Sequence, residues 1–266
     1  MINRILFIAT TNPRIRDAIH TITSWFPFAE YHIIEVVKTP AAVTTYNDMY
    51  IRELERIADK AMNEMVKEFY KHGIDDVTTY KTLGISHKEI LKYAREKAID
   101  MIVIPTTLLR KHELRLSSTA RGVIARSTIP LFIYTPKAYF RESVRVILNP
   151  TTCTRAGFVA TVFSIKLAKQ LHAKVKILKM VEGHEWYVED AKDIAKKFEV
   201  NVEIMETTER TPEKILEMAE DSDLIVATRA RPGIAYKLRY IVPSWSIGRL
   251  EEEVIKRAPV PLILTP

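Results

Sequence analysis

The sequence predicts two tandem α/β domains, each a doubly wound parallel sheet of five strands, packed together as a pseudo-dimer. The chain has 266 residues, whereas a typical domain takes about 100–200 residues, so two domains are expected. Short apolar runs alternate with helical patterns, which is typical of parallel sheets covered by helices on both faces. The same order of runs occurs twice along the chain, which indicates an internal repeat.

The repeat begins with a buried strand that ends in turn residues. Residues 5–9 and 146–148 are apolar, and each run is followed by threonine, asparagine and proline before a helical pattern starts at 14–25 or 156–171. Aligning Ile8 with Leu148 brings the two runs together, and we use this alignment to compare the loops that follow.

The later elements repeat in the same order. Ser86 and Thr211 each open a helical segment as N-cap-type residues. Asp100 and Asp223 each precede a continuous apolar strand, as expected for a sheet buried on both faces. Each half closes with a helix and a last apolar strand after a proline. The repeat restarts near residue 138, which predicts domains at residues 1–138 and 139–266.

Composition excludes several classes of protein. Hydrophobic residues make up 47% and charged residues 27% of the chain, which argues against disorder. No apolar stretch reaches the roughly 18 residues of a membrane span, and residues 5–9 are too short for a signal peptide, so we expect a cytoplasmic protein and no membrane partner. The single cysteine, Cys153, excludes an internal disulfide. The net charge of +7 is spread over helices that mix both signs, which is typical of solvated faces.

Two copies of one motif point to a known family. The pattern V-[LI]-x-[RK]-[AS]-x-x-P occurs at residues 123–130 and again at 254–261, each time between an Asp-led apolar strand and a final apolar strand. Both halves in this way resemble the universal stress protein family. The resemblance implies a doubly wound five-stranded fold, pairing of domains through the last strands at 131–135 and 262–265, and a role in stress or regulation through binding rather than catalysis.

Nucleotide-binding members of that family carry an Asp after the first strand and G-x2-G-x9-G-[ST] after the fourth. In the first half, Thr10 stands at the Asp position, and Pro105 and Leu108 stand at the first two glycines. Proline has no N–H to offer a phosphate, so we expect this half not to bind ATP. Ser118 is then expected merely to cap the last helix. The degenerate first-half site comprises Thr10, Pro105, Ser117, Ser118 and Thr119.

The second half departs from the pattern in a different way. Asn149 replaces the Asp and can still hydrogen-bond a ribose hydroxyl or a base. Residues 228–249 carry five Lys or Arg side chains and no acidic one. ATP, AMP or a phosphate-like anion is the ligand class that such a segment suits beside a helix N-terminus, and a solvated basic loop is an equally weighted alternative. The candidate residues are Asn149, Thr228, Arg229, Arg231, Gly248 and Arg249.

Other functions remain open as alternatives. A phosphoryl-transfer or nucleotide-hydrolysing enzyme would use the basic loop 228–249, but the sequence shows no base, no magnesium ligands and no catalytic residues. A nucleic-acid binder would use the same loop and would show steep salt dependence. The seven histidines lack metal-ligand spacing, so no metal is expected. The expected partner is a small anionic ligand or a protein, and further homodimerisation stays open.

Overall fold

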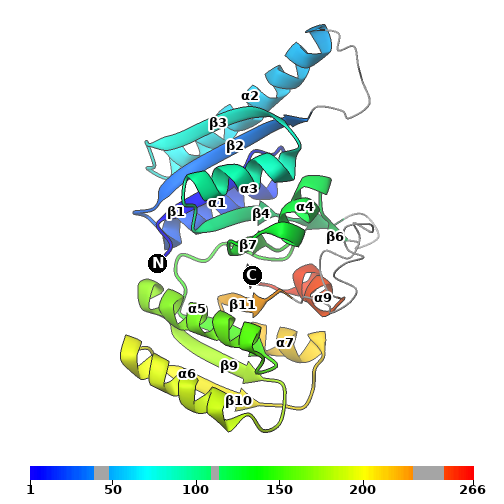
Figure 1. The fold of residues 1–266 in the computed structure, drawn as a ribbon. Helices are drawn as coiled ribbons and strands as arrows, with labels where there is room; N and C mark the ends of the chain where they lie inside the picture. Colours follow the sequence, from blue (N-terminus) through cyan, green and yellow to red (C-terminus); the bar gives the residue numbers. More distant parts are fainter. Residues whose placement is uncertain (39–47, 109–113, 230–248) are drawn as a thin grey trace.

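The computed structural model describes residues 1–38, 48–108, 114–229 and 249–266 (Figure 1). The elements of the first half are β1 (Arg4–Ile8), α1 (Arg14–Trp25), β2 (Glu30–Lys38), α2 (Asp48–Lys71), β3 (Val77–Gly84), α3 (Ser86–Glu96), β4 (Met101–Pro105), β5 (Thr107–Leu108), β6 (Leu114–Arg115), α4 (Ser118–Arg126) and β7 (Leu131–Tyr134). Those of the second half are β8 (Val146–Thr151), α5 (Arg155–Leu171), β9 (Lys174–Lys179), α6 (Glu185–Phe198), β10 (Val202–Glu206), α7 (Pro212–Ala219), β11 (Leu224–Thr228), α9 (Arg249–Arg257) and β12 (Leu262–Thr265).

Ten strands form one continuous sheet that runs through both halves. Its order is β10-β9-β8-β11-β12-β7-β4-β1-β2-β3, so each half contributes five neighbouring strands in the same doubly wound order. All neighbours within a half are parallel. The last strands meet antiparallel, with Phe132 opposite Ile263. The predicted tandem fold and its pseudo-dimer packing are therefore confirmed.

Helices cover both faces of this sheet (Figure 1). Apolar residues of α1, α2, α5 and α6 form one core layer, and those of α3, α4, α7 and α9 form the other. Strand residues alternate between the two layers, as Phe7 and Leu6 of β1 illustrate. Both core layers contain residues of both halves, because the sheet between them is unbroken. Within the described ranges, no helix has the length and apolar character needed to cross a bilayer.

The acidic residue before the fourth strand of each half fixes the start of the first strand. One oxygen of Asp100 accepts two consecutive backbone N–H groups at 2.8 and 2.9 Å, the second from Arg4 at the start of β1. Asp223 does the same at 2.8 and 2.9 Å, the second from Val146 at the start of β8. Carboxylates that accept backbone N–H groups make strong hydrogen bonds, so both aspartates are structural.

This shared contact corrects the sequence alignment of the two first strands. Because Arg4 and Val146 are equivalent, Leu148 matches Leu6 and not Ile8. The strand pairing agrees, since Ile5 pairs with the residue after Asp100 and Ile147 pairs with the residue after Asp223. Asn149 therefore corresponds to Phe7 inside the strand. The residues of an apolar run are alike, so the sequence does not show which residues of the two strands are equivalent. The sequence alignment was therefore shifted by two residues.

Thr135 links the halves beside the central strand pair. Its hydroxyl is fully buried and lies 2.9 Å from the carbonyl oxygen of Ala258 and 3.1 Å from that of Val260, just after α9. These carbonyl groups belong to the other half of the chain, so the contact ties the last strand of one half to the last helix of the other.

We predict that Thr135→Val lowers the free energy of unfolding by about 1–3 kcal/mol, because it leaves buried carbonyl groups without their donor. Urea unfolding followed by circular dichroism measures the change. Thr79→Val, the same substitution at an exposed position of β3, should stay within about 0.5 kcal/mol of the parent. Equal stability of the two variants would show that the Thr135 contact contributes nothing.

Two histidines with lowered pKa values make stability depend on pH. His32 of β2 is 7% exposed, and its Nδ1 lies 2.9 Å from the hydroxyl of Tyr93 on α3. Burial lowers the pKa of His32 below its ordinary value of 6.5. Burial also lowers the pKa of His72, whose ring stacks on that of His20 with centroids 4.4 Å apart. The folded state therefore binds fewer protons than the unfolded chain in mild acid, so stability is lost as the pH falls below about 6.5.

We expect the free energy of unfolding to decrease between pH 7 and pH 5.5, and His32→Gln to make that decrease smaller because one depressed pKa is removed. Urea midpoints across the pH series provide the measurement. Thr79→Val alters an exposed residue that has no titratable group and should leave the pH slope as it was. A His32→Gln slope as steep as the parent's would rule out a contribution from His32.

Candidate functional site

A cleft opens at the carboxyl ends of the first-half strands. It consists of two adjoining cavities of about 750 and 440 Å³, both lined by Thr10, Thr11, Glu35, Ser86 and Thr119. We call these cavities together the first-half cleft. It lies where β1 stands between β2 and β4, the point at which the strand order reverses. Ligands of doubly wound folds bind at this switch point.

The loop after β1 forms the floor of the cleft and is tied to β4. The Thr10 hydroxyl accepts the backbone N–H of Asn12 at 3.1 Å, and the Asn12 side chain accepts the backbone N–H of Arg14 at 3.0 Å. The Asn12 amide also donates to the carbonyl of Pro105 at 3.3 Å. Side-chain bonds to nearby backbone hold such turns in one conformation, so Thr10 and Thr11 are presented to the cleft in fixed positions.

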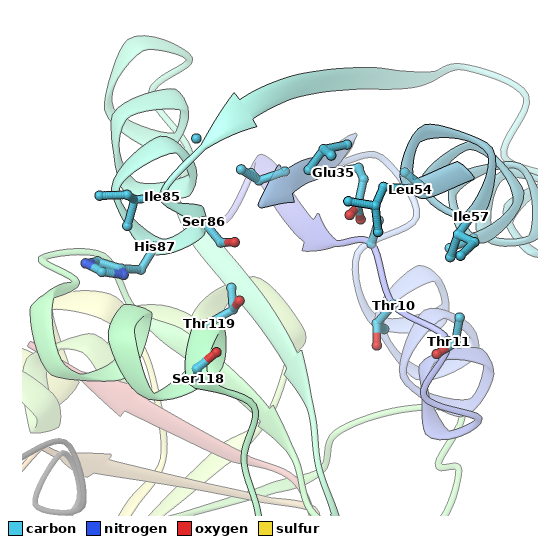
Figure 2. Close-up of a pocket in the computed structure, with 16 residues that line it drawn as sticks. Thr10, Thr11, Glu35, Leu54, Ile57, Ile85, Ser86, His87, Ser118 and Thr119 are labelled. Carbon is cyan, nitrogen blue, oxygen red and sulfur yellow. The ribbon is translucent and has the colours of Figure 1, made fainter. Parts of the chain in front are cut away.

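The N-terminus of α4 forms the opposite side. The Ser117 hydroxyl accepts the backbone N–H of Ala120 at 3.0 Å, so the helix is capped by Ser117 and not by Ser118 as the sequence suggested. Ser118 and Thr119 occupy the first helical turn and line the cleft with Ser86 of α3, as Figure 2 shows. The first turn of a helix has N–H groups without intrahelical partners, so this wall offers donors as well as hydroxyls.

The larger cavity has an apolar wall. Its members come from β2, α2 and the start of α3, and Ala58 and Ala61 are small enough to leave the space open. The remaining apolar lining residues of this cavity are Val36, Val37, Leu54, Ile57 and Ile85, with Ala9 at the end of β1. Helix α2 has 24 residues against 14 in its counterpart α6, so the extra turns of the first half supply part of this wall.

Charge in the cleft is sparse. The carboxylate of Glu35 points toward the open space in Figure 2. His87 lies at the border with its ring against α4, where a Cβ on Gly122 would come within 2.7 Å of it. Burial, followed by Arg126 and Lys88, lowers the pKa of His87, which keeps the imidazole neutral near pH 7. Among the described residues that line the cleft, none is Lys or Arg.

The structure brings the five first-half candidates to this cleft. Thr10, Pro105, Ser117 and Thr119 line the smaller cavity, and Ser118 lines the larger one. The backbone after β4 forms a short antiparallel hairpin of β5 and β6 where the family's glycine loop would lie, and Leu108 belongs to it. Sequence reasoning missed Glu35 and the α2 wall, because neither belongs to the family's nucleotide motif.

Asn149 lies inside the second half. Its side chain is fully buried, its amide donates to the carbonyl of Val226 at 2.8 Å, and its oxygen accepts the Thr161 hydroxyl at 2.5 Å. The corrected register explains this position, because the equivalent of Asn149 is the core residue Phe7. Thr152, which is exposed, stands at the strand end where Thr10 stands in the first half. The geometry therefore gives Asn149 a structural role in place of the predicted ligand contact.

Arg229 points into the first half. It is 7% exposed, and its guanidinium donates to the carbonyls of Ile124 and Ser127 at the end of α4, the latter at 3.0 Å. A cation at a helix C-terminus is favourable for the helix dipole. The Thr228 hydroxyl donates to the carbonyl of Ala156 at 3.0 Å. These two candidates contact separate helices and do not converge on one site.

The rest of the basic loop lies beyond what the structure describes. Arg231 and Gly248 fall within residues 230–248, and of Arg249 only the backbone, at the first residue of α9, is described. An anion site at Arg249 stays a prediction.

No metal centre is visible in the described parts of the chain, where no three His, Cys, Asp or Glu side chains are grouped to hold an ion. Cys153 is a buried free thiol, and burial raises its pKa. A raised pKa keeps the thiol protonated and poorly nucleophilic. Cys153 is therefore a core residue of the second half.

Comparisons with known proteins agree with this architecture. The model of the universal stress protein family matches residues 29–135. A universal stress protein from Archaeoglobus fulgidus DSM 4304 is similar in structure with a TM-score of 0.75; it is 16% identical, and the match covers 100% of this chain and 96% of that one. A functionally unknown protein from Pseudomonas aeruginosa PAO1 is similar with a TM-score of 0.60 at 14% identity, over 99% of this chain and 92% of that one.

A search of curated proteins found no match to the chain. The family model covers most of the first half, and the Archaeoglobus fulgidus structure extends the same fold over the second. The ten-stranded sheet, with two halves joined through their last strands, is consistent with both findings. Residues 29–135 therefore match the universal stress protein family, and the whole chain has the fold of the Archaeoglobus fulgidus universal stress protein.

Proposed function

We propose that this protein is a non-catalytic binding protein, acting in stress or regulation, whose first-half cleft takes a small uncharged ligand of the nucleoside class. The observation that carries the proposal is the lining of the cleft. Hydroxyl groups of Ser86 and Thr119 face an apolar wall across a cavity of about 750 Å³, which Thr10 also lines. Sites for small ligands are typically apolar with a few placed polar groups, in volumes of about 300–1,000 Å³.

A nucleoside matches the two sides of the cleft. Its planar base suits the apolar wall formed by β2 and α2, where Val36 and Ala58 are buried. Its ribose hydroxyls suit the hydroxyl side formed by α3 and α4. The position at the reversal of strand order supports the same assignment.

Several features oppose a triphosphate. The described lining contains no Lys or Arg that could pair with the charges of a phosphate chain. Pro105 lacks an N–H, and a hairpin replaces the glycine loop after β4.

Binding without catalysis is supported by where the titratable groups lie. His87 packs with its ring against Gly122 of α4 at the edge of the cleft, and Glu35 lies on the other side (Figure 2). General acid–base catalysis needs groups within hydrogen-bond reach of one reacting atom. The cleft instead surrounds an open space with hydroxyl groups, which suits ligand recognition.

We further propose that the chain is organised as domains at residues 1–138 and 139–266. The five first-half strands end with β7 and the second-half strands begin with β8, and the proposed boundary falls between them. The antiparallel pairing of β7 with β12 supports two domains that stay together as a unit.

We predict that isothermal titration calorimetry shows adenosine binding to the full chain with an affinity greater than that of ATP. Thr119→Val removes one hydroxyl at constant shape and should weaken adenosine binding about twofold to tenfold, the loss expected for one hydrogen bond. Ala58→Phe fills the apolar side of the larger cavity and should abolish binding.

The matched control is Thr79→Val, the same change on the exposed part of β3, which should bind adenosine like the parent. Absence of adenosine binding by the parent chain, or tighter binding of ATP than of adenosine, would refute the proposed function.

A further inference from the structure

We propose that the larger cavity of the first-half cleft contains an apolar compartment, lined by residues 54–61 of α2, and that this compartment binds an apolar group carried by the base of the nucleoside. The inference rests on the proposed function, because it narrows the ligand of the same cleft to nucleosides with an apolar substituent on the base. It depends on one feature of the fold, the apolar face of α2, which continues past the hydrophobic core and lines the cavity.

The apolar face of α2 serves two purposes along its length. Met65 and Phe69, in the second half of the helix, are 2% and 0% exposed and belong to the core layer that α2 shares with α1. Toward the N-terminus the same helical spacing continues through Ala61 and Ala58 to residue 54. Ala58 and Ala61 are buried, yet they belong to neither core cluster of the described residues, and they line the larger cavity instead. The face of the helix thus passes from the core to the cavity.

The compartment lies to one side of the strand ends. The smaller cavity is lined by the loop after β1, the end of β4 and the start of α4, and no described residue of α2 lines it. The α2 residues line only the larger cavity, which shares Ser86 and Thr119 with the smaller one. Figure 2 shows Leu54 and Ile57 on the α2 side of the open space, across from these two hydroxyl groups. A ligand that fills both parts is therefore polar at one end and apolar at the other.

Apolar side chains at the edge of the compartment remain in contact with water. Ile57 of α2 is 47% exposed, and Ile85, just before α3, is 49% exposed, although both line the larger cavity. Removing apolar surface from water is favourable in proportion to the area removed. An apolar group that covers these side chains gains this free energy, whereas a polar group of the same size does not. The compartment therefore selects for an apolar group.

The structure of a nucleoside places such a group at one position of the base. With the ribose on the hydroxyl side of the cleft, the six-membered ring of an adenine base lies toward β2 and α2. The exocyclic amine N6 is on the edge of the base remote from the ribose. An alkyl group on N6 thus extends toward Leu54 and Ile57 and leaves the ribose in place.

A homologous series of ligands tests the compartment. Titration calorimetry on the full chain measures the affinities of adenosine and of its N6-methyl, N6-propyl and N6-pentyl derivatives. Burying one methylene group strengthens binding by at most about fourfold, so the affinity should rise about twofold to fourfold with each added carbon. A site that ends at the base would show no rise along the series.

Ile57→Asn removes apolar surface from the compartment at an exposed position. It should reduce the gain from adenosine to N6-pentyladenosine about fivefold and leave the affinity for adenosine within about twofold of the parent's. Leu54→Asn, on the same wall, should have the same effect and serves as the test if Ile57→Asn does not fold. Circular dichroism establishes the fold of each variant.

Tyr70→Asn is the matched control. It removes an apolar side chain that is 52% exposed on the same helix, and Tyr70 is not among the described residues that line the cleft. Its affinities for all four nucleosides should equal those of the parent.

The outcomes separate the two proposals. If the parent binds adenosine but its affinity does not rise along the series, the compartment is refuted while the nucleoside site stands. A rise that Ile57→Asn and Leu54→Asn leave unchanged refutes the compartment as well. Binding of N6-pentyladenosine without binding of adenosine would refute the proposed function and, if Ile57→Asn weakened it, support the compartment. If the parent binds none of the four nucleosides, both proposals fail.

Discussion

The antiparallel pairing of β7 with β12 is the contact on which the arrangement of the whole molecule depends. A doubly wound sheet leaves its last strand with unpaired N–H and C=O groups, and exposed edges of this kind invite pairing with another strand. Here each half covers the edge of the other, with Phe132 opposite Ile263 in a fully buried position. The two sheets become one, and both core layers run through the centre of the chain.

This central pairing also determines which polar residues have a structural role. Because the last strands are joined, the last helix of each half lies against the other half, and its C-terminal carbonyl groups need donors. Thr135 supplies one near α9, and Arg229 supplies the other at α4. Arg229, a buried arginine of the basic segment, therefore links the two halves. Buried carbonyl groups without a donor would be costly, so Arg229 stabilises the contact between the halves.

Sequence patterns predicted the fold well and the site only in part. Periodicity, the two aspartates and the two V-[LI]-x-[RK]-[AS]-x-x-P motifs were enough for the architecture, because burial on both faces leaves a strong apolar signal. The register of β8 was not recoverable in this way, since each position of an apolar run looks alike. Asn149 was consequently predicted in a loop, although it lies inside the strand beneath α5. Glu35 was not predicted to line the cleft, because its position there depends on the pairing of β2 with β1.

The two halves have one fold and different sites for a physical reason. A sheet and its helices are specified by burial, which tolerates many substitutions, whereas a ligand site depends on a few atoms at the strand ends. In the first half a longer α2 and small alanines leave an open chamber at that place. At the equivalent strand of the second half, Asn149, Thr161 and Tyr187 form a buried hydrogen-bonded network whose groups bond one another. This network stabilises the packing of the second half, whereas the polar residues at the strand ends of the first half line an open cavity.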